Sequence, residues 1–145
     1  MSTFQKVVWS SKSYNHDTPT ELFLDLHKEF DFTLDPTDRP RIGEGRKNGL
    51  KESWGTKQKP NKIYLNPPYG RQLTKRWIYK SWQELQFGNV EFVVFLLPSR
   101  TGTDWFAFLM NKGAEFRVNR GRLKFGTAKE GAPFDSIIVI LRPNQ

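Results

Sequence analysis

The spacing of hydrophobic positions changes several times along the chain, and each spacing predicts one kind of element. Apolar residues three or four apart predict helices over about residues 19–29, 71–86 and from Thr103 or Asp104 to about Met110. Alternating or continuous apolar runs predict strands over residues 32–36, 62–65, 90–97, 114–118 and 136–141. Strands and helices that alternate in this way predict an α/β fold, a three-layer sandwich around a mostly parallel sheet. No helix joins the last two strands, so we expect them to form an antiparallel hairpin.

Local signals mark the ends of the predicted helices. Thr18 is suited to the N-cap of the first helix, Pro19 to its first position and Glu21 to a capping box. The second helix is expected to end at Gly88-Asn89, because these two residue types accept the left-handed conformation that often closes a helix. On this local evidence, the plain interpretation of Thr18-Pro19 is a helix cap.

The most polar part of the chain is the segment 36–61, which we predict to be a long basic loop, with at most a short helical turn over 48–54. Long loops inside compact domains are usually functional or mobile. Its cations could follow the phosphates of a nucleic acid, and a solvated loop is the alternative. The basic residues in or beside it are Arg39, Arg41, Arg46, Lys47, Lys51, Lys57, Lys59 and Lys62.

Length and charge narrow the class of protein. The 145 residues suit a single domain over 1–145, with an irregular segment over 1–16. The net charge is +8, from 23 Lys and Arg against 15 Asp and Glu, and aromatic residues are abundant. A basic chain rich in aromatic residues is typical of a nucleic-acid-binding protein, although many basic proteins bind no anionic partner specifically.

Several classes of site are excluded or not expected. The chain has no cysteine, which excludes disulfides, Cys-ligated zinc and thiol nucleophiles. It has two histidines, so we expect no metal site. No apolar run approaches the length of a membrane span, and the first eight residues lack the hydrophobic region of a signal peptide. We therefore expect a cytoplasmic protein without membrane contact.

The stretch Asn66-Pro67-Pro68-Tyr69-Gly70 follows a predicted strand and precedes a predicted helix. Its two prolines remove two N–H donors and restrict two backbone angles, while their carbonyl groups remain acceptors. Asn66 adds a side-chain acceptor, and Tyr69 adds a flat aromatic face. Because open α/β sheets bind ligands at the carboxyl ends of their strands, this turn predicts a rigid site for a planar group that carries an NH₂.

Asp35 stands at the end of the predicted strand over residues 32–36. A carboxylate at that place can accept a hydrogen bond from a ribose hydroxyl or an amino group of a bound cofactor. A turn that the Asp35 side chain closes before Pro36 is the alternative, and local evidence alone favours it.

The Asn66–Tyr69 tetrapeptide matches the (Asp/Asn/Ser)-Pro-Pro-(Tyr/Phe/Trp) motif of amino methyltransferases that use S-adenosylmethionine. Other motifs accompany it in a set order: Thr18-Pro19, Phe32-x-Leu34-Asp35-Pro36, Leu50-x-x-x-Trp54, Leu97-Pro98-x-Arg100, Trp105-Phe106 and Gly121-Arg122-Leu123-Lys124-Phe125. Over roughly residues 9–141, the chain thus resembles the phage-type DNA N6-adenine methyltransferase (Dam-like) family. It departs from these enzymes because no glycine-rich motif follows Asp35-Pro36 and no target-recognition domain is evident.

This resemblance implies a compact Rossmann-like methyltransferase fold and a site-specific DNA methyltransferase, which transfers a methyl group from S-adenosylmethionine to adenine N6 after base flipping. The catalytic residues that it implies are Asn66, Pro67, Pro68 and Tyr69. The residues implied for the cofactor are Thr18, Pro19, Asp35 and Asn66. Those proposed for the DNA substrate are Tyr69, Arg100, Arg122, Lys124 and Phe125. If the chain is encoded by a phage, its expected location is the cytoplasm of the host.

The absence of cysteine also bears on the reaction. Methylation at C5 of cytosine normally needs a cysteine nucleophile, whereas direct transfer to an exocyclic nitrogen needs no covalent intermediate. Adenine N6 fits best, and cytosine N4 stays open because it carries the same NH₂. Two alternatives also remain: a methyltransferase that acts on RNA or on a protein glutamine, and an inactive nucleic-acid-binding module of the same fold.

Overall fold

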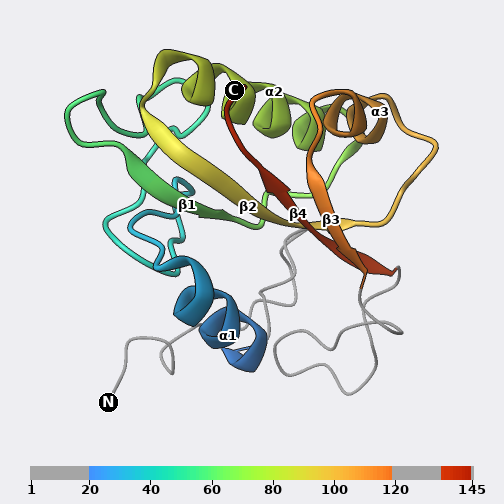
Figure 1. The fold of residues 1–145 in the computed structure, drawn as a ribbon, viewed down its shortest axis with the longest axis horizontal. Helices are drawn as coiled ribbons and strands as arrows, with labels where there is room; N and C mark the ends of the chain where they lie inside the picture. Colours follow the sequence, from blue (N-terminus) through green and yellow to red (C-terminus); the bar gives the residue numbers. More distant parts are fainter. Residues whose placement is uncertain (1–19, 119–134, 145) are drawn as a thin grey trace.

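The computed structural model describes residues 20–118 and 135–144 (Figure 1). The helices in these ranges are α1 (Thr20–Phe30), α2 (Arg71–Phe87) and α3 (Asp104–Asn111). The strands are β1 (Asn61–Leu65), β2 (Val90–Pro98), β3 (Glu115–Val118) and β4 (Ser136–Leu141). Each of these elements lies within two residues of a segment predicted from the hydrophobic pattern. None of the helices in the described ranges is long and apolar enough to cross a membrane.

The sheet is mixed, with the strand order β1-β2-β4-β3. Strands β1 and β2 pair in parallel, while β4 is antiparallel to both β2 and β3. The predicted C-terminal antiparallel pair is confirmed. The prediction that the sheet is mostly parallel is wrong. The reason is that β4 inserts between β2 and β3, so two of the three strand pairs of the described sheet are antiparallel. The predicted strand over 32–36 is reduced to one parallel bridge between Leu34 and Ile63.

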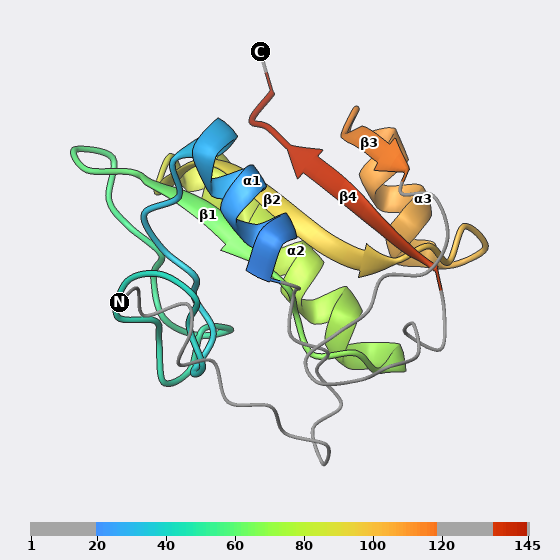
Figure 2. The same ribbon diagram turned by 90° about the horizontal axis from the view of Figure 1, so that it is seen from below.

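Helices cover both faces of the sheet: α1 lies on one face, and α2 and α3 lie side by side on the other (Figures 1 and 2). Successive side chains of β2 point alternately to the two faces of the sheet, and both sets are buried. Val93 and Phe95 join the core beneath α2 and α3, whereas Val94 and Leu96 join the core beneath α1. All four side chains are fully buried, which explains the nearly continuous apolar run of this strand.

The helix ends follow their local signals. Gly88 has the left-handed conformation at the C-cap of α2, with φ of 78°. Thr103 caps α3, because its hydroxyl accepts from the backbone N–H of Phe106 at 3.3 Å. The predicted cap of the first helix, Thr18 and Pro19, lies outside the described residues.

The segment 36–60 contains no helix or strand, but it is packed on the body of the protein. Trp54 is fully buried, and its backbone N–H donates to the Glu84 carboxylate on α2 at 2.6 Å. The guanidinium of Arg46 donates to the carbonyls of Ser53 and Gly45, both at 2.8 Å. Part of the positive charge of this loop is therefore structural. Its exposed cations are Arg39, Lys47, Lys51, Lys57 and Lys59.

Candidate active site

The candidate site lies at the edge of the sheet where the parallel strands have their carboxyl ends. The turn 66–70 follows β1, and Arg100 follows β2 after Ser99. Asp35 follows Leu34, which pairs in parallel with Ile63 of β1. Because the three segments run in the same direction, their ends meet at one edge. The structure thus places Asp35, the turn 66–70 and Arg100 along one edge of the sheet, and of the predicted site residues only Tyr69 and Arg100 line the pocket there.

The turn after β1 is held by the first turn of α2. The buried Thr74 hydroxyl donates to the carbonyl of Pro68 at 3.2 Å, and the Thr74 N–H donates to the carbonyl of Gly70 at 3.1 Å. In contrast, no donor among the described residues bonds the carbonyl of Pro67. Asn66 is half-buried. The local geometry therefore fixes Pro68, whereas Pro67 is buried and its carbonyl has no described donor.

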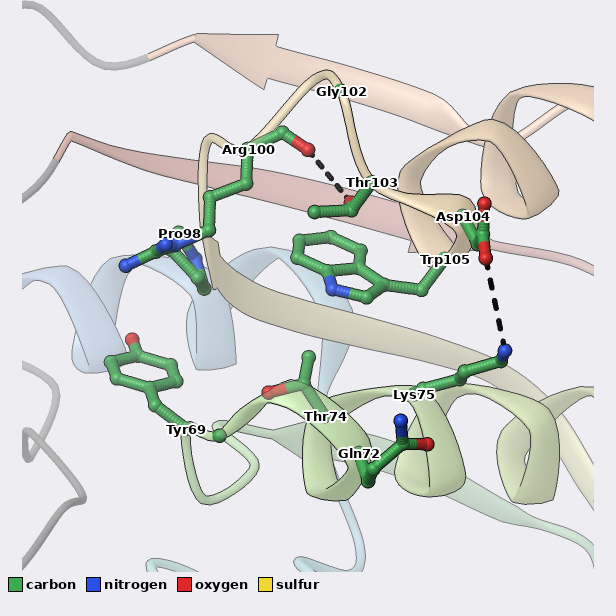
Figure 3. Close-up of a pocket in the computed structure, with 11 residues that line it drawn as sticks. Tyr69, Gln72, Thr74, Lys75, Pro98, Arg100, Gly102, Thr103, Asp104 and Trp105 are labelled. Atoms are coloured by element: carbon green, nitrogen blue, oxygen red, sulfur yellow. Dashed lines mark hydrogen bonds and ion pairs between the residues drawn. The ribbon is translucent and has the colours of Figure 1, made fainter.

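A pocket of about 490 Å³ opens beside this turn (Figure 3). This volume lies within the roughly 300–1,000 Å³ of small-molecule sites. Figure 3 shows the side chains of Tyr69 and Arg100 pointing toward one another from two different loops. The residues that line the pocket are Tyr69, Gly70, Gln72, Thr74, Lys75, Pro98, Arg100, Gly102, Thr103, Asp104 and Trp105.

The pocket has a polar wall where α2 faces α3. The Lys75 ammonium lies 3.9 Å from the Asp104 carboxylate, and the Thr103 hydroxyl donates to the carbonyl of Arg100 at 2.8 Å. Burial raises the pKa of the Tyr69 hydroxyl, so this group stays neutral at physiological pH. Sequence reasoning missed Lys75 and Asp104. The available signal was topological, since the helices that follow two neighbouring parallel strands begin at the same edge.

Asp35 organises the beginning of the basic loop. One carboxylate oxygen accepts from the hydroxyl and the N–H of Thr37, at 2.8 and 3.2 Å, and the other accepts from the N–H of Arg41 at 2.8 Å. An ionised carboxylate offers about four acceptor positions, so these three hydrogen bonds leave roughly one without a described donor on a residue that is 3% exposed. The loop-closing interpretation is therefore correct, and any contact with a cofactor would come in addition to it.

The stability of the protein should depend on pH through Asp35. Burial raises the pKa of this carboxyl from 3.8 to about 6, against the opposing effect of its hydrogen bonds. Between these values the folded state binds more protons than the unfolded state, so stability falls as pH rises. The contribution is fully present below pH 3.8 and is lost as pH rises through about 6.

We expect the free energy of unfolding to fall by about 3 kcal/mol more in the wild type than in Asp35→Asn between pH 3.5 and 7.5, at 1.4 kcal/mol per pKa unit. Urea unfolding at a series of pH values measures this difference. The amide of the variant cannot ionise, so its profile lacks this step. Parallel profiles for the two proteins would contradict the prediction.

Other predicted site residues lie outside the described ranges. They are Thr18, Pro19, Arg122, Lys124 and Phe125. Within the described ranges, no three histidine or acidic side chains gather as a possible metal site.

Comparison with known proteins gives one finding. A family model described as DNA N-6-adenine-methyltransferase (Dam) matches residues 8–144 of the chain. No curated protein gives a significant match.

Proposed function

The chain belongs to the DNA N-6-adenine-methyltransferase (Dam) family, and from this premise we propose that it methylates N6 of an adenine that has been flipped out of a DNA duplex. Membership of the family implies a DNA substrate and S-adenosylmethionine as the methyl donor. The finer proposal concerns how the residues of this chain perform the transfer. Its main support is the turn Asn66–Tyr69, which stands beside a pocket at the carboxyl edge of the sheet.

The proposed roles of Asn66 and Pro67 follow from the chemistry of the amino group. The lone pair of adenine N6 is conjugated with the ring, which makes this nitrogen a poor nucleophile. Two acceptors aimed at its hydrogens draw it toward a tetrahedral geometry and expose the lone pair. The Asn66 side-chain oxygen and the Pro67 carbonyl are the proposed pair. Their preorganised dipoles then stabilise the positive charge that develops on N6 during transfer.

The proposed base pocket explains how a flipped adenine is held. Extruding a base from a duplex costs about a few kcal/mol. Stacking on an aromatic face contributes about 1–3 kcal/mol per base, which offsets much of this cost. Tyr69 offers such a face at the pocket wall, and the neighbouring Arg100 supplies a cation for the adjoining phosphate. Phe125 is the proposed partner on the opposite face of the base.

The residues at the sheet edge fit the polar groups of S-adenosylmethionine, which supplies the electrophilic methyl group when bound. Asn66 offers an amide at this edge, and Asp35 retains about one acceptor position there. The Ser136 hydroxyl is buried and has no hydrogen-bond partner in the described part of the chain. It lies opposite Pro98 in the sheet, beside the same edge. We propose that these groups, with Thr18 and Pro19, orient the donor, because proximity supplies much of the acceleration.

Incubation of the protein with labelled S-adenosylmethionine and unmethylated duplex DNA tests this function. We expect label in N6-methyladenine after digestion to nucleosides, and none when every adenine of the duplex is already methylated. Label only in N4-methylcytosine, in RNA or in protein glutamine would overturn the proposal in favour of the corresponding activity. DNA binding without cofactor binding in calorimetry would indicate a binding module.

A further inference from the structure

A second feature of the helix layer borders the pocket. Three aromatic side chains cluster where α2 and α3 meet, and two of them, Trp82 and Phe108, also pack against the core. A lysine lies at each end of this cluster. Tyr79 and Trp82 both meet Phe108 edge to face, with ring centroids 4.7 and 6.3 Å apart. The Lys75 ammonium lies 5.6 Å from the centre of the Tyr79 ring. We refer to Lys75, Tyr79, Trp82, Phe108 and Lys112 as the aromatic–lysine surface.

The two lysines are held over the rings while they remain in contact with water. The Lys112 ammonium lies 5.0 Å from the centre of the Trp82 ring and 5.4 Å from that of Phe108. Tyr79 is 40% exposed, and the other members of the surface are half-buried. A cation over an aromatic ring keeps its full charge and loses part of its conformational freedom. These lysines are thus partly ordered before any partner arrives.

The charge of this part of the protein is positive. Among the described side chains of α2, α3 and Lys112, three cations are exposed or half-buried and do not pair with a buried acid. They are Lys75, Arg76 and Lys112, and the one exposed acid in the same set is Asp104. The other acid of these helices, Glu84, is buried and already bonded by Lys80 at 3.0 Å. A surface of this charge fits an anionic partner. Lys75 would exchange its ion pair with Asp104, at 3.9 Å, for such a partner, whereas no described acid pairs with Lys112.

The surface is continuous with the candidate active site. Lys75 belongs to both, since it also lines the pocket beside Tyr69. Helices α2 and α3 lie side by side on one face of the sheet and both begin at its carboxyl edge (Figure 1). Lys75 precedes Trp82 by seven residues, or about 10 Å of helix. Over that length of duplex axis, one DNA strand carries roughly three phosphates, at 3.4 Å of axis each.

We propose that the aromatic–lysine surface binds the phosphate backbone of the DNA next to the flipped adenine, with Lys75 and Lys112 as its two contacts. This inference rests on the proposed function and extends it to a second region of the protein. The aromatic side chains are not needed to stack on bases, because the lysines already cover them. Their role is to hold the ammonium groups in place, which lowers the entropy lost when a phosphate binds.

The salt dependence of DNA binding tests this proposal. Each phosphate contact contributes about 0.9 to the slope of log K against log salt concentration. We therefore expect the slope of Lys112→Gln to be smaller than that of the wild type by about 1, and its affinity near 0.1 M salt to fall several-fold. Lys75→Gln should give a similar change. The measurement uses fluorescence anisotropy of a labelled duplex with the full chain and S-adenosylmethionine.

Two control variants make the result specific. Lys112→Arg keeps the charge and should retain the wild-type slope. Arg142→Gln removes the same charge at the end of β4, where Arg142 pairs with Glu115, and should also leave the slope unchanged. A slope for Lys112→Gln equal to that of Arg142→Gln would overturn the proposal. If the wild type bound DNA but formed no N6-methyladenine, the proposed function would fail while the surface contact could still be demonstrated.

Discussion

Replacing Asn66 by alanine should lower turnover by roughly 10²–10³-fold at saturating DNA and cofactor, which is the effect of removing one preorganised transition-state group. The variant loses one of the two acceptors proposed for the hydrogens of adenine N6. The carbonyl of Pro67 remains, because it belongs to the backbone. A lowered rate constant with a smaller change in DNA affinity would indicate that the lost interaction acts mainly in the transition state.

Single-turnover methylation with quantification of N6-methyladenine measures this effect, since product release does not enter the rate. Calorimetry of S-adenosylmethionine binding by the same variant separates loss of the donor from loss of chemistry. Asn144→Ala is a matched control, because Asn144 is exposed beyond the end of β4. Wild-type turnover in Asn66→Ala would show that the Asn66 side chain has no part in the reaction.

Replacing Trp54 by alanine should lower the free energy of unfolding by about 3–5 kcal/mol, as is typical for loss of a large buried aromatic side chain. Trp54 is fully buried, and its indole N–H donates to the carbonyl of Gly49 at 2.7 Å. Its ring stacks on Trp77 of α2, with centroids 6.1 Å apart. The variant loses this packing and leaves the Gly49 carbonyl without its donor.

Urea unfolding followed by circular dichroism measures this loss. Phe87→Ala is the matched control, because Phe87 is 53% exposed at the end of α2 and its loss should cost less than about 1 kcal/mol. A Trp54→Ala variant as stable as Phe87→Ala would contradict the role of Trp54 as the anchor of the 36–60 loop.

Gly49, whose carbonyl accepts from the Trp54 indole, lies at a position where only glycine fits. A Cβ added at Gly49 would lie 2.1 Å from the carbonyl oxygen of Pro36 and 2.6 Å from the Trp77 ring. Glycine therefore permits the loop to approach both the start of the segment and α2. Asp35 directly precedes this loop at the sheet edge, so the packing of Gly49 against Pro36 lies next to the candidate site.

Local sequence signals were sufficient to predict the three helices, the four strands and the turn Asn66–Tyr69 between β1 and α2 in the described ranges. Helix spacing, the Thr103 cap and the Gly88 C-cap act over a few residues, so their effects can be predicted without the rest of the chain. The two prolines restrict the backbone covalently, and this constraint is equally local. The burial of β2 on both of its faces could also be predicted, because its apolar run is nearly continuous.

Only the tertiary structure decided the strand order, the pocket and the roles of individual charges. The insertion of β4 between β2 and β3 depends on contacts between distant segments, which no local pattern reveals. The same holds for Lys75 and Asp104, which meet across two helices. Packing also gives the cations different surroundings. Arg46 bonds backbone carbonyls of its own loop, whereas the half-buried Lys112 lies over an aromatic cluster. Residue type determined what each side chain can do, and long-range packing determined where it does so.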